Sequence, residues 1–202
     1  LSLIIKLFPY KQKLLFTSLD SIRYNINRKQ KNLKFFEFDK AYSLEEKEYK
    51  ESSKIGIYIT GLKQEEHFVN KPENVSFFDV INITNKVLNI ARISDFETKP
   101  KAESKTLDMC LEIISNGVVL GEVGMVKKEI LKTFEISQDV YHAEIDWPNL
   151  IMNFDKEFKF SEIPKFPQVQ RDLSLVMNKD VKYNDVISVI DLNKNKILKK
   201  VS

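Results

Sequence analysis

The spacing of apolar residues predicts two amphipathic helices in the first half of the chain. The first covers about four turns, because apolar residues recur at helical intervals at Leu15, Leu19, Ile22 and Ile26. The second follows Ser76, a suitable N-cap, with Asp79 placed three residues later as a partner for the first-turn amides. Its apolar stripe consists of Phe77, Val80, Ile81, Val87, Leu88 and Ala91.

Alternation of apolar and polar residues predicts strands around these helices. We expect a strand at residues 33–38 and another at 55–61. Residues 107–124 are typical of a hairpin, since Asn116-Gly117 supplies the positive φ angles of a type I′ turn. Residues 140–147 alternate again.

The stretches between these elements set the predicted organisation. Residues 43–54 are charged and lack an apolar period, so we interpret them as a solvated connection. Residues 127–134 predict a short amphipathic helix. A polar turn at residues 153–159 is the best domain boundary, which predicts one domain at 1–153 and a second at 158–202.

The second predicted domain opens on the most specific string in the chain, from Phe166 to Val176. Its Phe166-Pro167 pair favours extended backbone, because proline disfavours the α region for the residue before it. Alternation at Leu173, Leu175 and Met177 predicts a strand. Helical spacing at residues 181–190 predicts a helix after it, as at the start of a β-α-β unit.

Composition narrows the range of functions. The chain has 202 residues, 43% hydrophobic and 30% charged, which is typical of a soluble globular protein. A net charge of only +3 disfavours a general RNA-binding module, so any RNA contact must be local. Only four of the 32 basic residues are arginine, the side chain best suited to bidentate phosphate recognition, which argues against a phosphate-handling active site.

Cysteine usage and the first residues bear on localisation. Cys110 stands alone in an apolar alternating run, so we expect a small buried hydrophobe in a reducing compartment. The apolar cluster from Leu1 to Phe8 is too short to cross a bilayer and lacks a signal peptide's cleavage pattern. The chain begins with Leu instead of Met. We therefore expect a cytoplasmic protein cut from a longer one, with no membrane association.

Several strings, in order, resemble one family. The Phe166 to Val176 string resembles the F-P-x-V-x-R-D-L-x-L-V strand that opens the C-terminal domain of the bacterial phenylalanine–tRNA ligase β subunit. Further similar segments, at matching spacing, are Asn25-Ile26-Asn27-Arg28, Leu33 to Phe38, Phe77-Phe78-Asp79-Val80, Gly121-Glu122-Val123-Gly124 and Val140 to Asp146. The resemblance covers residues from about 14 to about 190.

This resemblance implies an α+β fold. The first part would be a noncatalytic, class II aminoacyl-tRNA synthetase-like domain, with a mainly antiparallel sheet flanked by helices. The second would be the start of a truncated ferredoxin-like, anticodon-binding domain. The whole enzyme would be a heterotetramer of two α and two β subunits that uses ATP and Mg²⁺ to attach phenylalanine to its tRNA. The family's editing site and magnesium-linked elements would lie upstream of residue 1, and we expect this chain to bind neither ATP nor metal.

A working class II core needs arginines that clamp ATP phosphates. Here the basic residue that ends the glycine-rich strand is Lys127, and Phe36-Glu37-Phe38 offers no arginine. We interpret Gly121 and Gly124 as permitting a bulge or close packing rather than as a phosphate cradle. His67 and His142 have no second ligand at a suitable spacing, so no metal site and no catalytic residue is predicted.

The candidate tRNA-binding residues belong to the C-terminal part: Lys165, Arg171, Lys182 and Tyr183. Basic contacts to phosphate and aromatic stacking of unpaired bases are typical of RNA recognition. Arg171 could equally pair with Asp172 inside the chain. The alternative function is a free-standing synthetase-core paralogue that binds a small molecule or activates an amino acid. It predicts a phosphate pocket on which basic groups converge.

Overall fold

The computed structural model describes residues 13–45, 48–64, 72–154, 169, 171–178, 181, 183–192 and 198. The chain divides into two compact units, Leu1–Phe158 and Lys159–Ser202. The first contains one sheet with its helices, and the second contains helix α6 (Tyr183–Leu192). No helix in the described ranges is long and apolar enough to cross a membrane.

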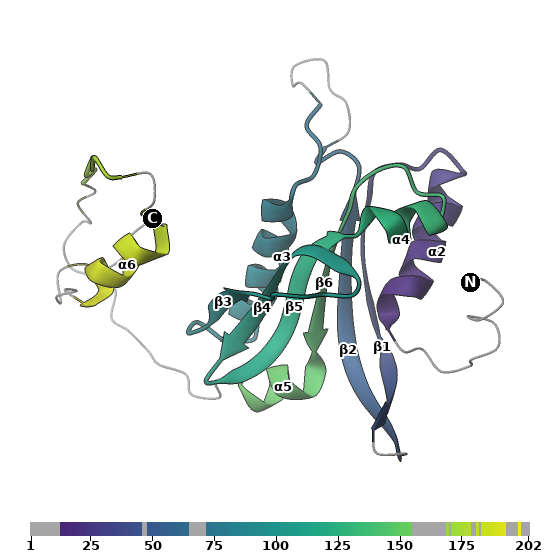
Figure 1. The fold of residues 1–202 in the computed structure, drawn as a ribbon, viewed down its shortest axis with the longest axis horizontal. Helices are drawn as coiled ribbons and strands as arrows, with labels where there is room; N and C mark the ends of the chain where they lie inside the picture. The colour runs from purple at the N-terminus through teal and green to yellow at the C-terminus, as the bar shows by residue number, and fades with distance from the viewer. Residues whose placement is uncertain are drawn as a thin grey trace. The chain divides into compact units, whose positions relative to one another are not determined.

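The first unit is built on a six-stranded sheet with the order β1-β2-β6-β5-β4-β3, and every neighbouring pair is antiparallel (Figure 1). The strands are β1 (Leu33–Glu45), β2 (Glu48–Thr60), β3 (Glu97–Pro100), β4 (Leu107–Ser115), β5 (Val118–Val126) and β6 (Val140–Asp146). The predicted antiparallel sheet flanked by helices is therefore present.

One face of the sheet is apolar and packs against α3 (Phe77–Ile90) and α5 (Trp147–Met152). Ile57, Ala143 and Ile145 lie in this core together with Leu88 of α3. The predicted capping box at the start of α3 is confirmed, because Asp79 accepts hydrogen bonds from the backbone amide and the hydroxyl of Ser76. The local sequence thus starts α3 at a position from which the helix packs against the apolar face of the sheet.

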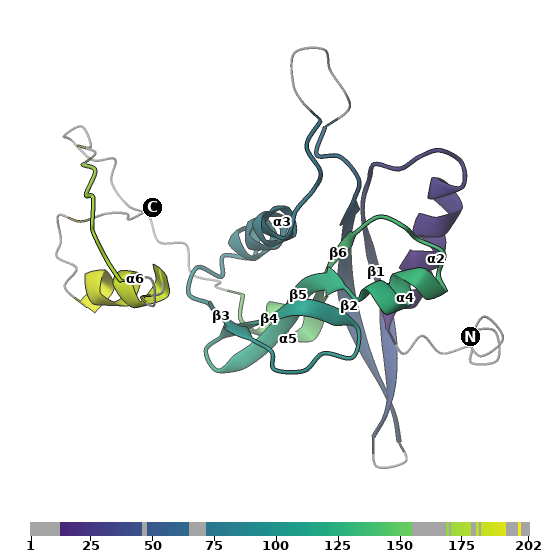
Figure 2. The same cartoon turned by 45° about the horizontal axis from the view of Figure 1, so that its top comes forward.

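The opposite face is covered in part by α2 (Leu14–Ile26) and α4 (Lys128–Thr133). Leu15, Leu19 and Ile22 of α2 are fully buried, as their spacing predicts. The rings of Phe16 and Phe134 lie 6.3 Å apart and join α2 to the end of α4. Both views show these two helices side by side (Figures 1 and 2).

The solvated connection predicted at residues 43–54 is wrong. β1 and β2 pair along their whole lengths and form a long hairpin that extends beyond the neighbouring strands (Figure 1). Strand pairing joins backbone groups and does not itself require an apolar period, so this hairpin leaves no signal in the side-chain pattern. β3 and α5 were not predicted, because four exposed residues and a six-residue helix carry too short a pattern.

In the second unit, the helix predicted at residues 181–190 is confirmed as α6. The strand predicted around Leu173 and Leu175 is not present: residues 171–178 lie outside any helix or strand and are exposed. Alternation alone does not make a strand, because strand backbone needs a hydrogen-bonded neighbour. The start of a ferredoxin-like domain stays a prediction.

The glycines of β5 allow close packing, as the sequence indicates. A Cβ atom added at Gly121 would collide with the carbonyl oxygen of Glu144 on β6, and one added at Gly124 would lie 3.0 Å from the carbonyl oxygen of Asp108 on β4. The register between β4 and β5 shifts beside Gly121. These glycines therefore serve contact between strands.

Replacing Gly121 with alanine should destabilise the chain by about 3 kcal/mol, because backbone on β6 cannot move away cheaply. Gly117 is the matched control: it lies in the β4–β5 turn at a φ of +75° with no atom within 4 Å of an added Cβ. Gly117→Ala should cost about 1 kcal/mol from backbone strain alone. Urea unfolding measures both, and equal losses would contradict the packing role.

Candidate functional site

A row of carboxylates crosses the sheet face that carries α2 and α4. Strand register pairs Glu37 with Gly56, Gly56 with Glu144, Glu144 with Glu122, and Glu122 with Glu112. Directly paired residues of antiparallel strands point to the same face of the sheet. Four glutamates from β1, β6, β5 and β4 therefore stand in one line, and we refer to them as the carboxylate row.

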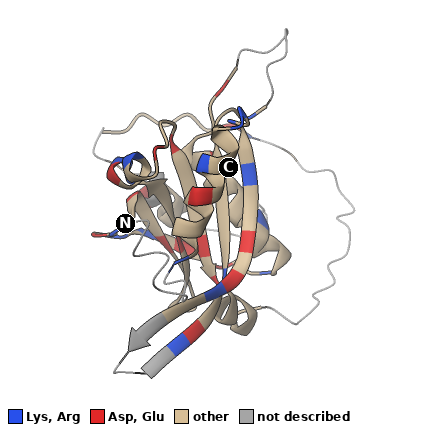
Figure 3. Ribbon diagram, turned by 90° about the vertical axis from the view of Figure 1, so that its right-hand side faces the viewer, with Lys and Arg blue, Asp and Glu red and all other residues tan. Residues whose placement is uncertain are grey.

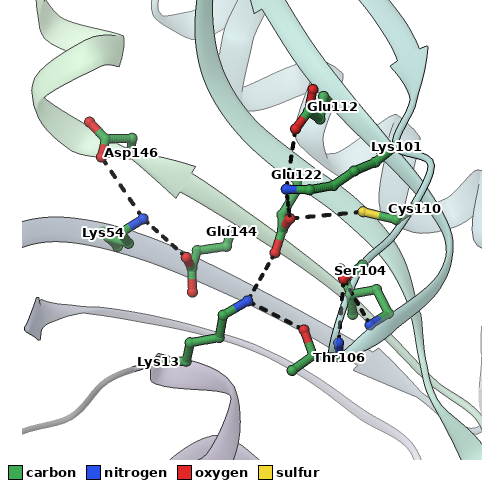
Figure 4. Close-up of polar contacts among 11 residues, drawn as sticks. Lys13, Lys54, Lys101, Ser104, Thr106, Cys110, Glu112, Glu122, Glu144 and Asp146 are labelled. Atoms are coloured by element: carbon green, nitrogen blue, oxygen red, sulfur yellow. Dashed lines mark hydrogen bonds and ion pairs between the residues drawn. The ribbon is translucent and has the colours of Figure 1, made fainter. Parts of the chain in front are cut away.

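Two lysines from outside the strands neutralise Glu122 (Figure 4). Lys13, immediately before α2, places its Nζ 3.3 Å from Glu122 Oε1 and 3.4 Å from the Thr106 hydroxyl. Lys101, between β3 and β4, places its Nζ 2.9 Å from Glu122 Oε2 and 3.2 Å from Glu112 Oε1. Like charges side by side in the row are thus bridged by cations.

Glu144 is held by a third lysine. Lys54 Nζ lies 3.2 Å from Glu144 Oε1 and 3.9 Å from Asp146 Oδ2. The other Glu144 oxygen, Oε2, is buried and accepts no hydrogen bond from the described part of the chain. Asp146 also accepts a hydrogen bond from the Ser52 hydroxyl at 2.9 Å.

Tyr58 fills the gap that Gly56 leaves in the row. Its ring stacks between Phe35 and His142, with centroid distances of 5.1 and 4.6 Å. A Cβ on Gly56 would lie 2.5 Å from the Tyr58 hydroxyl oxygen, so glycine is required beside this ring. Next to Gly56 in the row, Glu37 accepts a hydrogen bond from the Ser18 hydroxyl of α2 at 2.8 Å. A hydrogen bond from α2 therefore holds the carboxylate at the β1 end of the row.

The pKa values of these groups do not suit acid–base or nucleophilic catalysis at neutral pH. Burial raises the pKa of the Cys110 thiol to about 11, and nearby Glu122 adds to the effect. Burial lowers the pKa of His142, whose Nδ1 lies 3.1 Å from the Ile57 carbonyl oxygen. Burial also acts to raise the pKa of Glu122, but Lys101 and Lys13 outweigh it and hold this pKa below its ordinary value. The thiol is thus protonated, the imidazole neutral and the carboxylate charged.

The described ion pairs of the row contain more carboxylates than lysines. Lys13, Lys54 and Lys101 stand against four carboxylates: Glu112, Glu122, Glu144 and Asp146. An excess of carboxylates is unfavourable for a nearby anion. Lys127, where the sequence places the end of the glycine-rich strand, is the N-cap residue of α4, and its amide donates to the Thr106 carbonyl.

A surface hollow beside α4 is also unsuited to phosphate. It has a volume of about 450 Å³, and the charged residues in its lining are two lysines and two acids: Lys128, Lys132, Glu135 and Asp139. Opposite charges in equal number do not make the converging basic pocket that a phosphate site requires. Among the described residues, no three His, Cys, Asp or Glu side chains are grouped to hold a metal ion.

The predicted tRNA-binding residues belong to the second unit. Arg171 is exposed, and within the described ranges no ion pair joins it to Asp172. Tyr183 is the first residue of α6. Lys165 and Lys182 lie outside the described residues. Their role in RNA binding stays a prediction.

The sequence reasoning missed the carboxylate row. The sequence contains one sign of this row, which is a charged residue between apolar ones in a buried strand. Examples are Glu122 in Gly121-Glu122-Val123 and Glu144 in Ala143-Glu144-Ile145. That signal marks single positions. Only the strand register makes them neighbours.

Comparison with known proteins assigns the family. The model of the phenylalanyl tRNA synthetase beta chain CLM domain matches residues 10–147. The chain belongs to this family. The match covers α2 and all six strands and ends at the first residue of α5.

Curated relatives extend the similarity over most of the chain. The phenylalanine–tRNA ligase beta subunit of Bacteroides thetaiotaomicron is 30% identical over an alignment of 213 residues. The alignment covers 95% of this chain and 25% of that protein. The beta subunit of Bacillus subtilis is 28% identical over 188 residues, covering 91% and 23%. This chain thus spans about a quarter of the length of these relatives.

Solved structures confirm the synthetase-like fold. Two structures of pyrrolysyl-tRNA synthetase from Desulfitobacterium hafniense give TM-scores of 0.54 and 0.55 over 70% of this chain, at 16% sequence identity. The matched regions span 48% and 49% of the lengths of those two synthetase chains. The prediction of a class II synthetase-like sheet flanked by helices is confirmed for the first unit.

Replacing Glu122 with glutamine should cost about 2 kcal/mol of unfolding free energy at pH 7, because two lysines lose their charged partner. The folded-state pKa of Glu122 is depressed below its ordinary 4.5, so its contribution is fully present above pH 4.5 and is lost as the pH falls through the folded-state value. Urea unfolding of both proteins from pH 7 to pH 3 measures this. A gap that is constant with pH would contradict it. Lys40→Gln, which breaks the exposed Lys40–Glu51 pair, is the control and should leave the stability nearly unchanged, because solvent screens an exposed pair.

Proposed function

We propose that this chain is a structural and tRNA-binding part of the β subunit of phenylalanine–tRNA ligase, and that its synthetase-like unit is noncatalytic. The observation that carries the noncatalytic part is the carboxylate row. In the described ion pairs of this sheet face, three lysines are held by four carboxylates, and this excess of negative charge would repel the phosphates of ATP. A face of this kind supports the packing of α2 and disfavours a nucleotide.

The proposal includes the partners of the whole enzyme. An α subunit would activate phenylalanine with ATP and Mg²⁺, in a cytoplasmic assembly of two α and two β subunits, and this chain would bind neither cofactor. tRNA for phenylalanine would contact the second unit through Lys165, Arg171, Lys182 and Tyr183. The second unit would be the start of a ferredoxin-like domain. Membership of the beta chain family supports this proposal.

Phenylalanine-dependent exchange between ATP and pyrophosphate tests the noncatalytic role. We expect no exchange by the β subunit that carries these residues when it is alone, and exchange when the α subunit is added. Lys127→Ala should leave the exchange rate of the complex unchanged, because Lys127 would not contact ATP. Exchange by the β subunit alone, abolished by Lys127→Ala, would overturn the proposal and favour a synthetase-core paralogue with its own activity.

A further inference from the structure

The end of α2 and the turn into β1 form a strongly basic surface. From Ser21 to Phe36 the chain has five basic residues and no acidic one: Arg23, Arg28, Lys29, Lys31 and Lys34. In Figure 3 this turn lies at the top, above the front strand β1, and basic positions gather there, whereas acidic and basic positions mix further down β1. We define Tyr24, Arg28, Lys29, Lys31 and Lys34 as the α2–β1 surface.

The cations of this surface differ from the lysines that form ion pairs elsewhere in the first unit. Six lysines elsewhere in the unit form ion pairs with carboxylates: Lys13, Lys40, Lys54, Lys63, Lys99 and Lys101. Within the described ranges, no ion pair joins Arg28, Lys29, Lys31 or Lys34 to a carboxylate, and Arg23 alone in this stretch pairs with Asp20. The positive charge of the α2–β1 surface is therefore available to an external anion.

An exposed aromatic ring lies among these cations. Tyr24 is 56% exposed, and the guanidinium carbon of Arg28 lies 3.4 Å from the centroid of its ring. The same guanidinium donates to the Tyr24 carbonyl at 3.2 Å, which fixes the stack. Aromatic rings and arginine planes are the groups on which proteins stack unpaired bases of RNA.

The helix dipole does not account for the whole surface. Cations in the last turn of a helix are stabilised by the dipole, but the effect fades within one turn. Arg28 lies near the end of α2, whereas Lys31 and Lys34 lie beyond it. Their side chains gain nothing from that dipole, so a different cause is needed for the continued absence of acidic residues.

Lys29 occupies a position that favours glycine. Its φ is +66°, and hydrogen bonds from Lys29 N to Ile26 O (2.9 Å) and from Gln30 N to Asn25 O (3.1 Å) form a Schellman motif at the end of α2. A side chain in the left-handed region is strained, and glycine would relieve the strain. A lysine retained at such a position is consistent with a use for its charge.

The turn is held in place by its neighbours. Gln138 donates to the Lys31 carbonyl at 2.7 Å, and Asn32 accepts from the Leu62 amide at 2.8 Å. Lys34 donates to the Lys63 carbonyl at 2.6 Å. A cationic surface fixed before binding loses little conformational entropy when a ligand arrives.

We propose that the α2–β1 surface is a second RNA-binding site of this chain, separate from the residues predicted in the second unit. Lys29, Lys31 and Lys34 contact phosphates of an RNA backbone, and the Tyr24–Arg28 stack receives an unpaired base. This inference rests on the proposed function only in that tRNA is the RNA concerned. An acidic protein segment is the other polyanion that could bind, but it would have no use for the stack.

The test is fluorescence anisotropy of a labelled tRNA transcript for phenylalanine, titrated with the 202-residue chain at several salt concentrations. Lys31→Glu with Lys34→Glu should weaken binding by at least about tenfold and reduce the log–log salt slope by about 1.4, as expected for two lost contacts to single-stranded phosphate. Tyr24→Ala should weaken binding of the transcript while leaving the salt slope unchanged, because stacking releases no counterions.

Lys29→Gly separates binding from folding. It should leave the Tm equal or higher, because glycine suits the left-handed position, yet weaken tRNA binding a few-fold. The matched control is Arg92→Gly at the end of α3, where Arg92 has a φ of +55° and the same pair of hydrogen bonds. Arg92→Gly loses the same charge from the same conformation and should leave tRNA affinity unchanged.

A second pair of substitutions distinguishes this inference from the proposed function. Arg171→Glu with Lys182→Glu removes two of the three basic residues predicted in the second unit. Loss of binding with this pair, but not with the α2–β1 variants, would overturn the inference and leave the proposed function standing. Loss with the α2–β1 variants supports the inference whatever the second pair does. No tRNA binding by the unaltered chain, or equal competition by a polyglutamate peptide, would overturn the inference.

Discussion

The structure of the first unit depends on neutralising three carboxylates, Glu112, Glu122 and Glu144, that lie in one line across the sheet. Burying an ionised carboxylate is costly unless it is paired and hydrogen-bonded. The cations come from different parts of the chain: Lys13 precedes α2, Lys54 lies in β2, and Lys101 lies between β3 and β4. Charge compensation therefore ties the start of α2 and the β3–β4 connection to the middle of the sheet.

The two faces of the sheet are stabilised by different interactions. Under α3 and α5 the strands present Ile57, Val123, Ala143 and Ile145, and ordinary hydrophobic packing suffices. The other face is apolar only where α2 and α4 lie, and polar beyond them. There, ion pairs with lysines compensate carboxylates that are largely shielded from water. The fold that this chain shares with pyrrolysyl-tRNA synthetase over 70% of its length thus combines one apolar face with one face that includes ion pairs.

The near-neutral net charge conceals an uneven distribution. On the sheet, lysines form ion pairs with glutamates. The turn between α2 and β1 has cations without carboxylate partners in the described ranges. The shortage of arginine predicts a sheet without a phosphate clamp, and this stays a prediction. It did not reveal the α2–β1 surface, where Arg28 stacks on Tyr24. Composition averages over positions, and binding depends on local charge.

Local patterns in the sequence determined the helices α2 and α3 and the β4–β5 hairpin. Helical spacing, the Ser76–Asp79 capping box and the Asn116-Gly117 turn act between residues close in the chain, so a short window contains the whole cause. The family resemblance likewise followed from ordered short strings, and the family match bears it out.

Only the tertiary structure decided the carboxylate row, the extended β1–β2 hairpin and the lack of a strand at residues 171–178. Glu112, Glu122 and Glu144 are isolated in the sequence, and register alone makes them neighbours. The hairpin is held by backbone pairing, which leaves no trace in side-chain pattern. An alternating segment becomes a strand only beside another strand. These features depend on contacts between distant residues, and the physical reason they escaped prediction is that no local window contains both partners.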